Sequence, residues 1–210
     1  MPASPRAAVE WPFAPGASPF HIKGLGYRSL IQYVETSVAG GMPRLLDAIE
    51  DPALRAFARQ PFLAASWYDV GPVITLNETI AGLLEMKLDD FLAMRGRMQA
   101  EDDLSGVYSW LLAVATPSAV AKGLPRLTQR YFDWGGVEIE TPAQRHVRAI
   151  RTGVPVYLAD WFGSVSCAFL EVAMGKAGAK QFTCDVTRAP WGEPTKVPSC
   201  ALRFDMHWDG

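Results

Sequence analysis

The spacing of apolar residues divides the chain into a helical first half and a second half in which strand-like runs flank one long helix. Before residue 132, apolar side chains recur every three or four positions. Residues 136–208 then contain two strand-like runs, an amphipathic helix and two more strand-like runs. This order predicts an α+β fold, in which an N-terminal helical layer packs on a C-terminal four-stranded antiparallel sheet.

The C-terminal strands carry the clearest alternation of apolar and polar residues. Strands are expected over residues 137–140, 146–152, 182–186 and 200–208, with the helix between the two pairs running from about 153 to 178. Phe182, Cys184 and Val186 alternate with polar neighbours, and the last run follows the same period. A period of two indicates that one face of the sheet is buried and the other meets water.

The first half predicts a series of short helices and one helix with a bend. These helices are expected around residues 27–38, 45–49, 52–60, 76–84, 88–95, 104–115 and 117–131, with a loop over 67–72. Asp102 and Asp103 are expected to precede the sixth helix, where carboxylates complement the positive end of the helix dipole. Pro125 removes a backbone hydrogen bond within the last helix and bends it. A bent helix is often a cavity wall, so we expect a cavity between it and the sheet.

Length and composition favour one domain with a short extension. Residues 1–18 are rich in Pro and Ala and have no period, whereas 19–210 form a single expected domain. The formal charge of −2 is dispersed, with no basic stripe for nucleic acid. No apolar run approaches the ~18 residues of a membrane span, and the start lacks the apolar core of a signal peptide. We therefore expect a cytoplasmic protein with no nucleic-acid partner and no membrane span.

The cysteines and the candidate nucleophiles give no catalytic motif. Cys167, Cys184 and Cys200 are isolated from one another, which predicts neither a zinc site nor a disulfide framework. If the last hairpin turns near Gly192, Cys184 and Cys200 would face each other, and whether they are redox-linked stays open. Ser164 and Ser166 have no neighbouring histidine to act as a base. The sequence therefore indicates a protein that is not an enzyme.

Three short strings and the element order resemble a known superfamily. The strings are Ala100-Glu101-Asp102-Asp103-Leu104, Gly106-Val107-Tyr108 and the ending Met206-His207-Trp208. From about residue 20 the chain resembles the heme nitric oxide/oxygen-binding sensors, the 4-vinyl-reductase-type small-ligand domains and the transport-complex subunits that share their fold. Within that superfamily it is most similar to a paralogous myxobacterial family of about 200 residues. The resemblance implies a sensor-like fold that encloses a small ligand.

The resemblance also implies that this chain has lost the heme apparatus. In the heme-binding members a histidine of the bent helix ligates iron, and the position similar to it here is Thr128. A neutral hydroxyl is a poor axial ligand. The same members hold the heme propionates with a Tyr-x-Ser-x-Arg motif, of which the similar stretch 147–153 keeps only Arg151. We expect no heme and no other cofactor. His21, His146 and His207 are conceivable metal ligands, but solvated roles are expected for them.

The candidate ligand site lies between the bent helix and the sheet. Its expected residues are Tyr108, Leu124, Thr128, Tyr131, Ala149, Arg151 and Trp161. Thr128 could contact the ligand or bond its own helix carbonyl, and the aromatic residues could be simple core. Arg151 shares a strand face with Ala149, so its charge needs an anionic ligand head, a carboxylate such as Asp160, or solvent. A small apolar molecule, with or without an acidic group, is the expected ligand.

Two functions remain open at the level of sequence. The first is a non-enzymatic small-ligand sensor or regulatory domain. The alternative is a homodimeric scaffold or adaptor that acts through protein contacts and fills its cavity with its own side chains. Residues 67–69 and 190–192 place aromatic side chains in expected loops, and exposed aromatic residues are enriched at protein interfaces.

Overall fold

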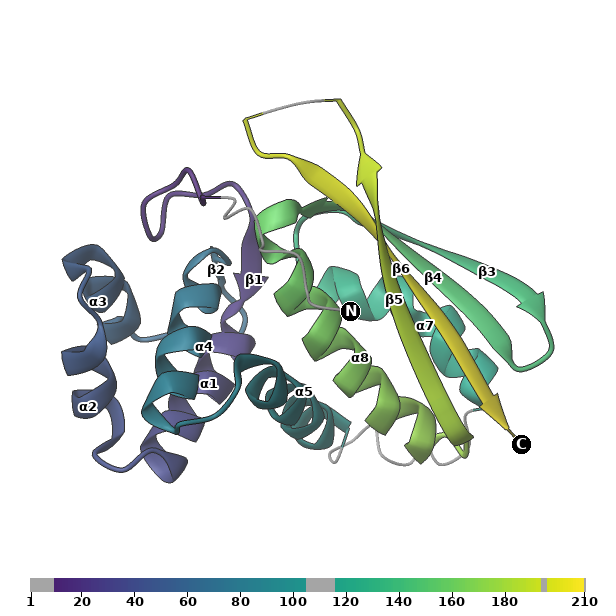
Figure 1. Ribbon diagram of the computed structural model, residues 1–210, viewed down its shortest axis with the longest axis horizontal. Coiled ribbons are helices and arrows are strands. Elements are labelled where there is room, and N and C mark those ends of the chain that lie inside the picture. The colour runs from purple at the N-terminus through teal and green to yellow at the C-terminus, as the bar shows by residue number, and fades with distance from the viewer. Residues whose placement is uncertain (1–9, 105–115, 194–195, 210) are drawn as a thin grey trace.

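The order of a helical layer followed by a four-stranded antiparallel sheet is confirmed. The computed structural model describes residues 10–104, 116–193 and 196–209. Its elements are β1 (His21–Lys23), α1 (Gly24–Ser37), α2 (Gly41–Ala48), α3 (Pro52–Arg59), β2 (Trp67–Asp69), α4 (Pro72–Leu83), α5 (Leu88–Leu104), α7 (Pro117–Tyr131), β3 (Gly136–Ala143), β4 (His146–Pro155), a one-turn 3₁₀ helix (Val156–Leu158), α8 (Ala159–Lys176), β5 (Lys180–Trp191) and β6 (Ser199–Asp209). Figure 1 shows α1 to α4 at one end and the sheet at the other, with α5 and α8 between them.

Local sequence signals account for where several helices begin. The Asp51 carboxylate accepts a hydrogen bond from the Ala53 amide, and Pro52 occupies the first turn of α3. Thr116 caps α7 in the same way, through a bond from the Ala119 amide. These caps satisfy amide groups that would otherwise have no partner at a helix start.

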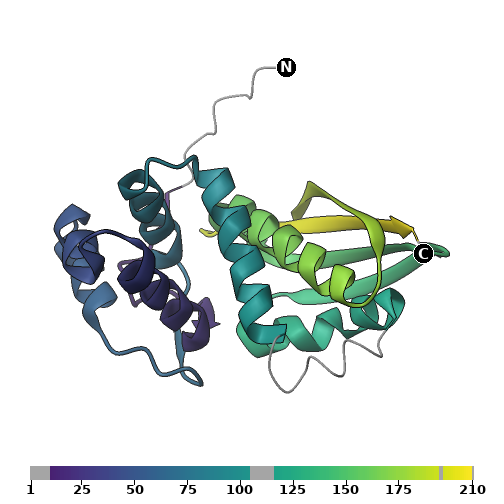
Figure 2. The same cartoon turned by 90° about the horizontal axis from the view of Figure 1, so that it is seen from below.

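The sheet has the order β3-β4-β6-β5, and all its neighbours are antiparallel. Ala149 lies opposite Phe204 and Arg151 opposite Leu202, so these four side chains share the inner face. Helices α7 and α8 cover that face, as Figure 2 shows from below. One apolar core extends through the sheet, α8 and the N-terminal helices. The predicted burial of one face of β6 is confirmed, since Cys200, Leu202, Phe204, Met206 and Trp208 are all buried. Ala201, expected on the wet face, is buried as well.

Several predictions of element boundaries were wrong. Asp102 and Asp103 lie in the last turn of α5 rather than at a helix start, because the good helix formers at 97–101 continue this helix past Gly96. The expected helix over 104–115 lies outside the described residues, apart from Leu104 at the end of α5. Residues 67–69 form β2, which pairs with β1, and three residues are too few to show an alternating period. The segment 153–155 ends β4 instead of starting a helix, because Pro155 still pairs with Ser199 across the sheet.

The helical stretch Val156–Lys176 differs from the expectation that no segment approaches the length of a membrane span. Among the described residues it is the one helical stretch that is long and apolar enough, by length and composition, to cross a membrane. The stretch is not an uninterrupted apolar run, because it contains Asp160 and Glu171. The core helix of a globular protein has the same length and composition, and α8 packs between the sheet and α5.

The register of β5 and β6 separates the two cysteines that were expected to face each other. Cys184 lies opposite Met206, and Cys200 lies opposite Pro190. The thiol of Cys184 instead contacts Cys167 of α8, at an Sγ to Sγ distance of 2.7 Å. Cys167 and Cys184 are half-buried, whereas Cys200 is buried. The thiol pair therefore joins the helix to the outermost strand.

This register predicts which disulfide forms on mild oxidation. Treatment of the native chain with diamide is expected to link Cys167 to Cys184, because a disulfide needs its two sulfurs in direct reach. Peptide mapping by mass spectrometry identifies the linked pair. The variant Cys200→Ser is expected to keep the cross-link and Cys167→Ser to lose it, and a Cys184 to Cys200 peptide would contradict the register.

Candidate functional site

A cavity of about 190 Å³ lies between the helices and the inner face of the sheet. Its walls come from α1, α4, α5, α7, α8 and the strands β3, β4 and β6. Most of the lining is apolar. Six expected site residues line it: Leu124, Thr128, Tyr131, Ala149, Arg151 and Trp161. Tyr108 falls outside the described residues. Whether these six side chains bind a ligand stays a prediction.

Arg151 brings a charge into this apolar surrounding. Arg151 is only 2% exposed, so solvent is not the partner of its charge. One guanidinium nitrogen donates to the carbonyl of Trp134, and Nε has no partner among the described residues. The guanidinium also lies 4.9 Å from the Trp134 ring and 5.6 Å from the Phe162 ring, distances typical of cation–π contact.

Burial is the cause of a lowered pKa at Arg151. The pKa falls below the ordinary value of an arginine, to about 10, because the charged form is taken out of water. Among the described residues no carboxylate forms an ion pair with Arg151. The ion pair with Asp160, one of the three partners that the sequence left open, is therefore not formed. Gly135 packs directly against the guanidinium, because a Cβ there would lie 3.2 Å from Arg151 Cζ and would clash with the Thr152 carbonyl oxygen. The Arg151 guanidinium thus has no carboxylate partner among the described residues, and the one carboxylate that lines the cavity, Asp103, is bonded to Tyr131.

A second buried arginine, Arg95, lines the same cavity from α5. It is 7% exposed, donates to Ser29 Oγ at 2.8 Å and lies over the Tyr33 ring at 4.8 Å. Burial lowers its pKa. Sequence reasoning missed Arg95 as a site residue, although a signal existed, because it falls on the same helical stripe as Phe91 and Leu92.

The polar side chains of α7 are partly engaged within the protein. Thr128 Oγ1 donates to the Leu124 carbonyl at 2.7 Å, which is the local bond that the sequence left open as an alternative to ligand contact. Tyr131 donates its hydroxyl proton to Asp103 at the end of α5. The Thr128 oxygen keeps its capacity to accept a hydrogen bond, whereas its proton is already used.

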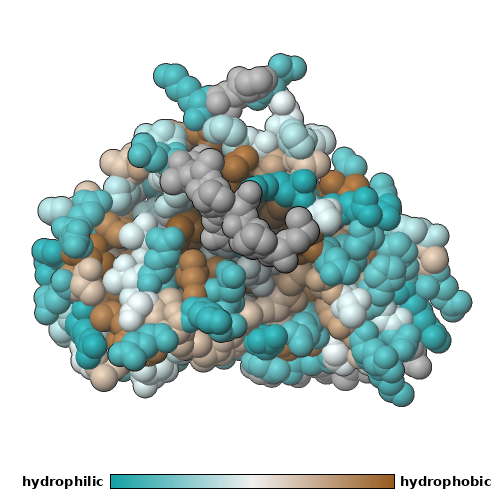
Figure 3. All heavy atoms as spheres, in the orientation of Figure 1, coloured by the Kyte–Doolittle hydropathy of each residue, from teal (hydrophilic) through white to brown (hydrophobic). Residues whose placement is uncertain are grey.

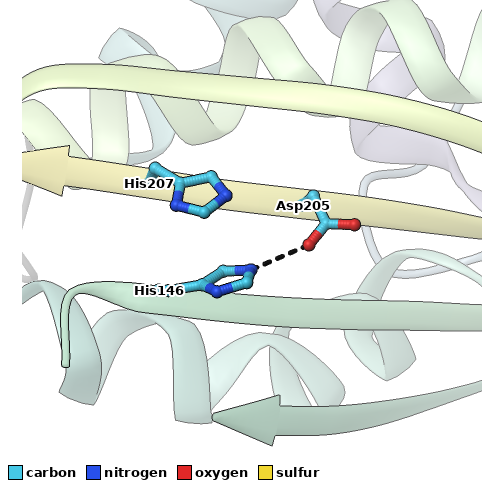
Figure 4. A group of neighbouring side chains, drawn as sticks. All are labelled: His146, Asp205 and His207. Carbon is cyan, nitrogen blue, oxygen red and sulfur yellow. Dashed lines mark hydrogen bonds and ion pairs between the residues drawn. The ribbon is translucent and has the colours of Figure 1, made fainter. Parts of the chain in front are cut away.

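The outer face of the sheet holds a second cluster, made of His146, Asp205 and His207 (Figure 4). His146 Nε2 lies 2.8 Å from Asp205 Oδ1, and the two imidazole rings stack with centroids 3.9 Å apart. Burial alone would raise the pKa of Asp205, but hydrogen bonds from His146 and Arg203, with the charge of Arg148, hold it at about 2. Figure 3 shows hydrophilic residues over the region of the strands. Sequence reasoning took the histidines one at a time and therefore missed this group.

Comparison with solved structures identifies the fold. Three H-NOX (heme nitric oxide/oxygen-binding) proteins match at high probability, and each match covers 90% of this chain. A point mutant from T. Tengcongensis has a TM-score of 0.64 at 10% identity, with 98% of that chain covered. The Fe(II) unliganded protein from K. algicida has a TM-score of 0.63 at 11% identity with 97% covered, and the S. oneidensis protein in the Fe(II)NO ligation state has a TM-score of 0.61 at 12% identity with 100% covered. At this identity the likeness shows the fold alone.

No protein-family model matches the sequence, and neither does any curated protein. The H-NOX-like part of the expected resemblance is confirmed at the level of fold. The similarity to a myxobacterial family and to the other two groups stays a prediction.

The close packing of α5 on α8 predicts that Gly96 cannot be replaced by a larger residue without loss of stability. A Cβ on Gly96 would lie 2.6 Å from the Val165 carbonyl oxygen and 2.8 Å from Ala168 Cβ. Gly96→Ala is therefore expected to lower the free energy of unfolding by about 1–2 kcal/mol, because it forces the two helices apart. Chemical denaturation measures the difference.

Gly123 of α7 provides the matched control for Gly96. It lies inside a helix with nothing within 4 Å of its Cβ position, so Gly123→Ala is expected to raise the free energy of unfolding by about 0.5–1 kcal/mol. Equal effects of the two substitutions would show that helix propensity, and not the α5 to α8 contact, decides the result.

Proposed function

We propose that this chain is a non-enzymatic sensor or regulatory domain that binds a small apolar ligand with an acidic group. The carrying observation is the apolar cavity with the buried, anion-free guanidinium of Arg151. A buried charge is costly unless it is paired, so a ligand carboxylate or similar anion would gain from this position. The volume suits a ligand of about the size of a substituted benzene ring, since a cavity of roughly 150 Å³ admits benzene.

Iron-bound heme does not fit the residues around this cavity. Among the described residues that line it there is no His, Cys or Met. Its two tyrosine hydroxyls, of Tyr27 and Tyr131, already donate to the Asp69 carbonyl and to Asp103. Thr128 stands at the position where the resemblance places the iron-binding histidine, and its hydroxyl proton is bonded to the Leu124 carbonyl of its own helix. These observations support a sensor that has exchanged the metal-held cofactor for a smaller guest.

The cavity walls provide a way for a ligand to change the protein. A guest would touch α5, α7, α8 and the sheet at once, because all four contribute lining residues. A ligand shifts a conformational equilibrium only through contacts that differ between the two states. The position of α7 and α8 on the sheet is therefore the property that ligand binding would bias.

One observation favours the second function, a homodimeric scaffold or adaptor. The outer strand β5 is exposed over most of its length, and Trp191 at its end is 47% exposed. Exposed aromatic residues beside an unpaired strand edge are suited to a protein partner. The open cavity argues against the part of this alternative in which the chain fills its own pocket. Homodimer formation and a cytoplasmic location remain proposals.

The absorption spectrum tests the claim about heme. Protein purified from cells supplied with a heme precursor is expected to show no Soret band in its absorption spectrum, because no described cavity residue offers iron a free ligand. A stoichiometric Soret band from purified protein would contradict the proposal.

The ligand class is tested with two probes of equal ring size, 4-fluorobenzoate and fluorobenzene, observed by ¹⁹F NMR. We expect both probes to bind, and the carboxylate to bind about tenfold more tightly through a charge-assisted bond to Arg151. Arg151→Met is expected to abolish this preference. Arg148→Met is the control, because Arg148 lies on the same strand but on the outer face.

Filling the cavity gives the second arm of this test. Ala149 lines the cavity from β4, so Ala149→Ile is expected to remove binding of both probes while the chain stays folded by circular dichroism. Ala189→Ile places the same side chain on the exposed strand β5 and is expected to leave binding unchanged. Failure of either probe to saturate, or undiminished binding by Ala149→Ile, would overturn the proposal.

A further inference from the structure

The sheet register brings three potential metal ligands to one spot on the outer face. His146 of β4 and His207 of β6 are direct cross-strand partners, and Asp205 lies two residues from His207 on the same face. Side chains at such positions approach within about 5 Å at Cβ and point in one direction. Figure 4 shows the three side chains together on one side of the two strands. One nitrogen or oxygen from each residue lies within 4.8 Å of the others.

We propose that His146, Asp205 and His207 form a binding site for a divalent transition-metal ion of the zinc class. Two imidazoles and one carboxylate suit Zn²⁺ and its neighbours, whereas Mg²⁺ and Ca²⁺ prefer oxygen ligands alone. Metal-to-ligand distances of about 2.1 Å require ligand atoms roughly 3.4 Å apart. Reaching that geometry requires rotation of the two stacked imidazole rings, of which that of His207 is exposed to solvent.

The charge around the cluster supports a bound cation. Asp185 lies directly opposite Asp205 across the β5 to β6 ladder, and like charges at such positions destabilise a sheet. Glu138 and Glu140 project from the same face of β3. A divalent ion held by Asp205 would offset the repulsion between these carboxylates.

Two arginines lie on the same face and form hydrogen bonds with its carboxylates. Arg203 and Arg148 both donate to Asp205, and Arg148 also donates to Glu140 at 2.8 Å. Their two positive charges offset two of the four carboxylates named above, so the arginines reduce the negative charge around Asp205. Their bonds also orient the carboxylate, as hydrogen-bond donors behind a metal ligand do.

A shallow hollow next to the cluster provides space for further ligands. It is lined by residues 143–146, Gln181 and 207–209, so it opens directly beside His146 and His207. Three protein ligands leave a fourth tetrahedral position, and water or an exogenous anion can enter it from the hollow. The site is thus of the open kind rather than a closed structural site.

Metal binding is tested on the full-length, tag-free chain after treatment with EDTA. Titration with Zn²⁺ against a chromophoric chelator is expected to give one equivalent of tight binding, and Co²⁺ is expected to show visible bands without a thiolate charge-transfer band. His207→Ala and Asp205→Asn are each expected to weaken Zn²⁺ binding by roughly tenfold or more. Circular dichroism of the two variants confirms that they are folded.

His21 supplies the matched control. It forms a histidine and aspartate pair with Asp133 at a distance of 2.5 Å, but this pair lacks a second histidine. His21→Ala is expected to leave the affinity for Zn²⁺ unchanged. The proposal is overturned if no equivalent binds, if His207→Ala binds as tightly as the wild type, if His21→Ala weakens binding equally, or if the Co²⁺ spectrum shows thiolate ligation. Because the cluster lies on the opposite face from the cavity, this result is independent of the proposed ligand function.

Discussion

The burial of the Arg151 charge is the constraint on which the inner site depends. The protein stabilises the guanidinium with aromatic faces and one backbone carbonyl, without an opposing carboxylate among the described residues. These contacts compensate only part of the lost hydration, as the lowered pKa indicates. Gly135 has to be a glycine for the chain to pass so close to this group, and its φ of +68° favours the same residue. The backbone conformation at Gly135 and the contacts of the guanidinium therefore fix the position of the Arg151 side chain.

The position of α8 couples the cavity to the rest of the molecule. One side of this helix packs on the sheet, and another lies against α5 at the close approach of Gly96. Trp161 and Phe162 at its start belong at once to the core and to the cavity wall. A core this tightly packed responds to a change at one wall by moving whole elements rather than by local adjustment. A small ligand that contacts the start of α8 would therefore change the position of this helix relative to α5 and the sheet.

The sequence was sufficient where a local period decides the structure, and insufficient where pairing across long distances does. Alternation along β4 correctly placed Arg151 on the inner face, and the helical period correctly predicted α3 and α7 over 52–60 and 117–131. The thiol contact of Cys184 and the grouping of His146 with His207 depend on strand register and on how α8 crosses β5. A one-residue change of register would move such side chains to the other face, and no local pattern fixes it.

The segment before β1 offers a natural optical reporter for the helical wall. Trp11 stacks on Tyr157, at a centroid distance of 5.0 Å, in the turn that leads into α8. The segment is held there by Asp69, whose carboxylate accepts bonds from the amides of Gly16 and Ser18. The Trp11 indole nitrogen is buried without a partner among the described residues. The chain has seven tryptophans, so the contribution of Trp11 to the emission is obtained by comparison with Trp11→Phe. Displacement of the helix would thus appear as a change in intrinsic fluorescence, without any added label.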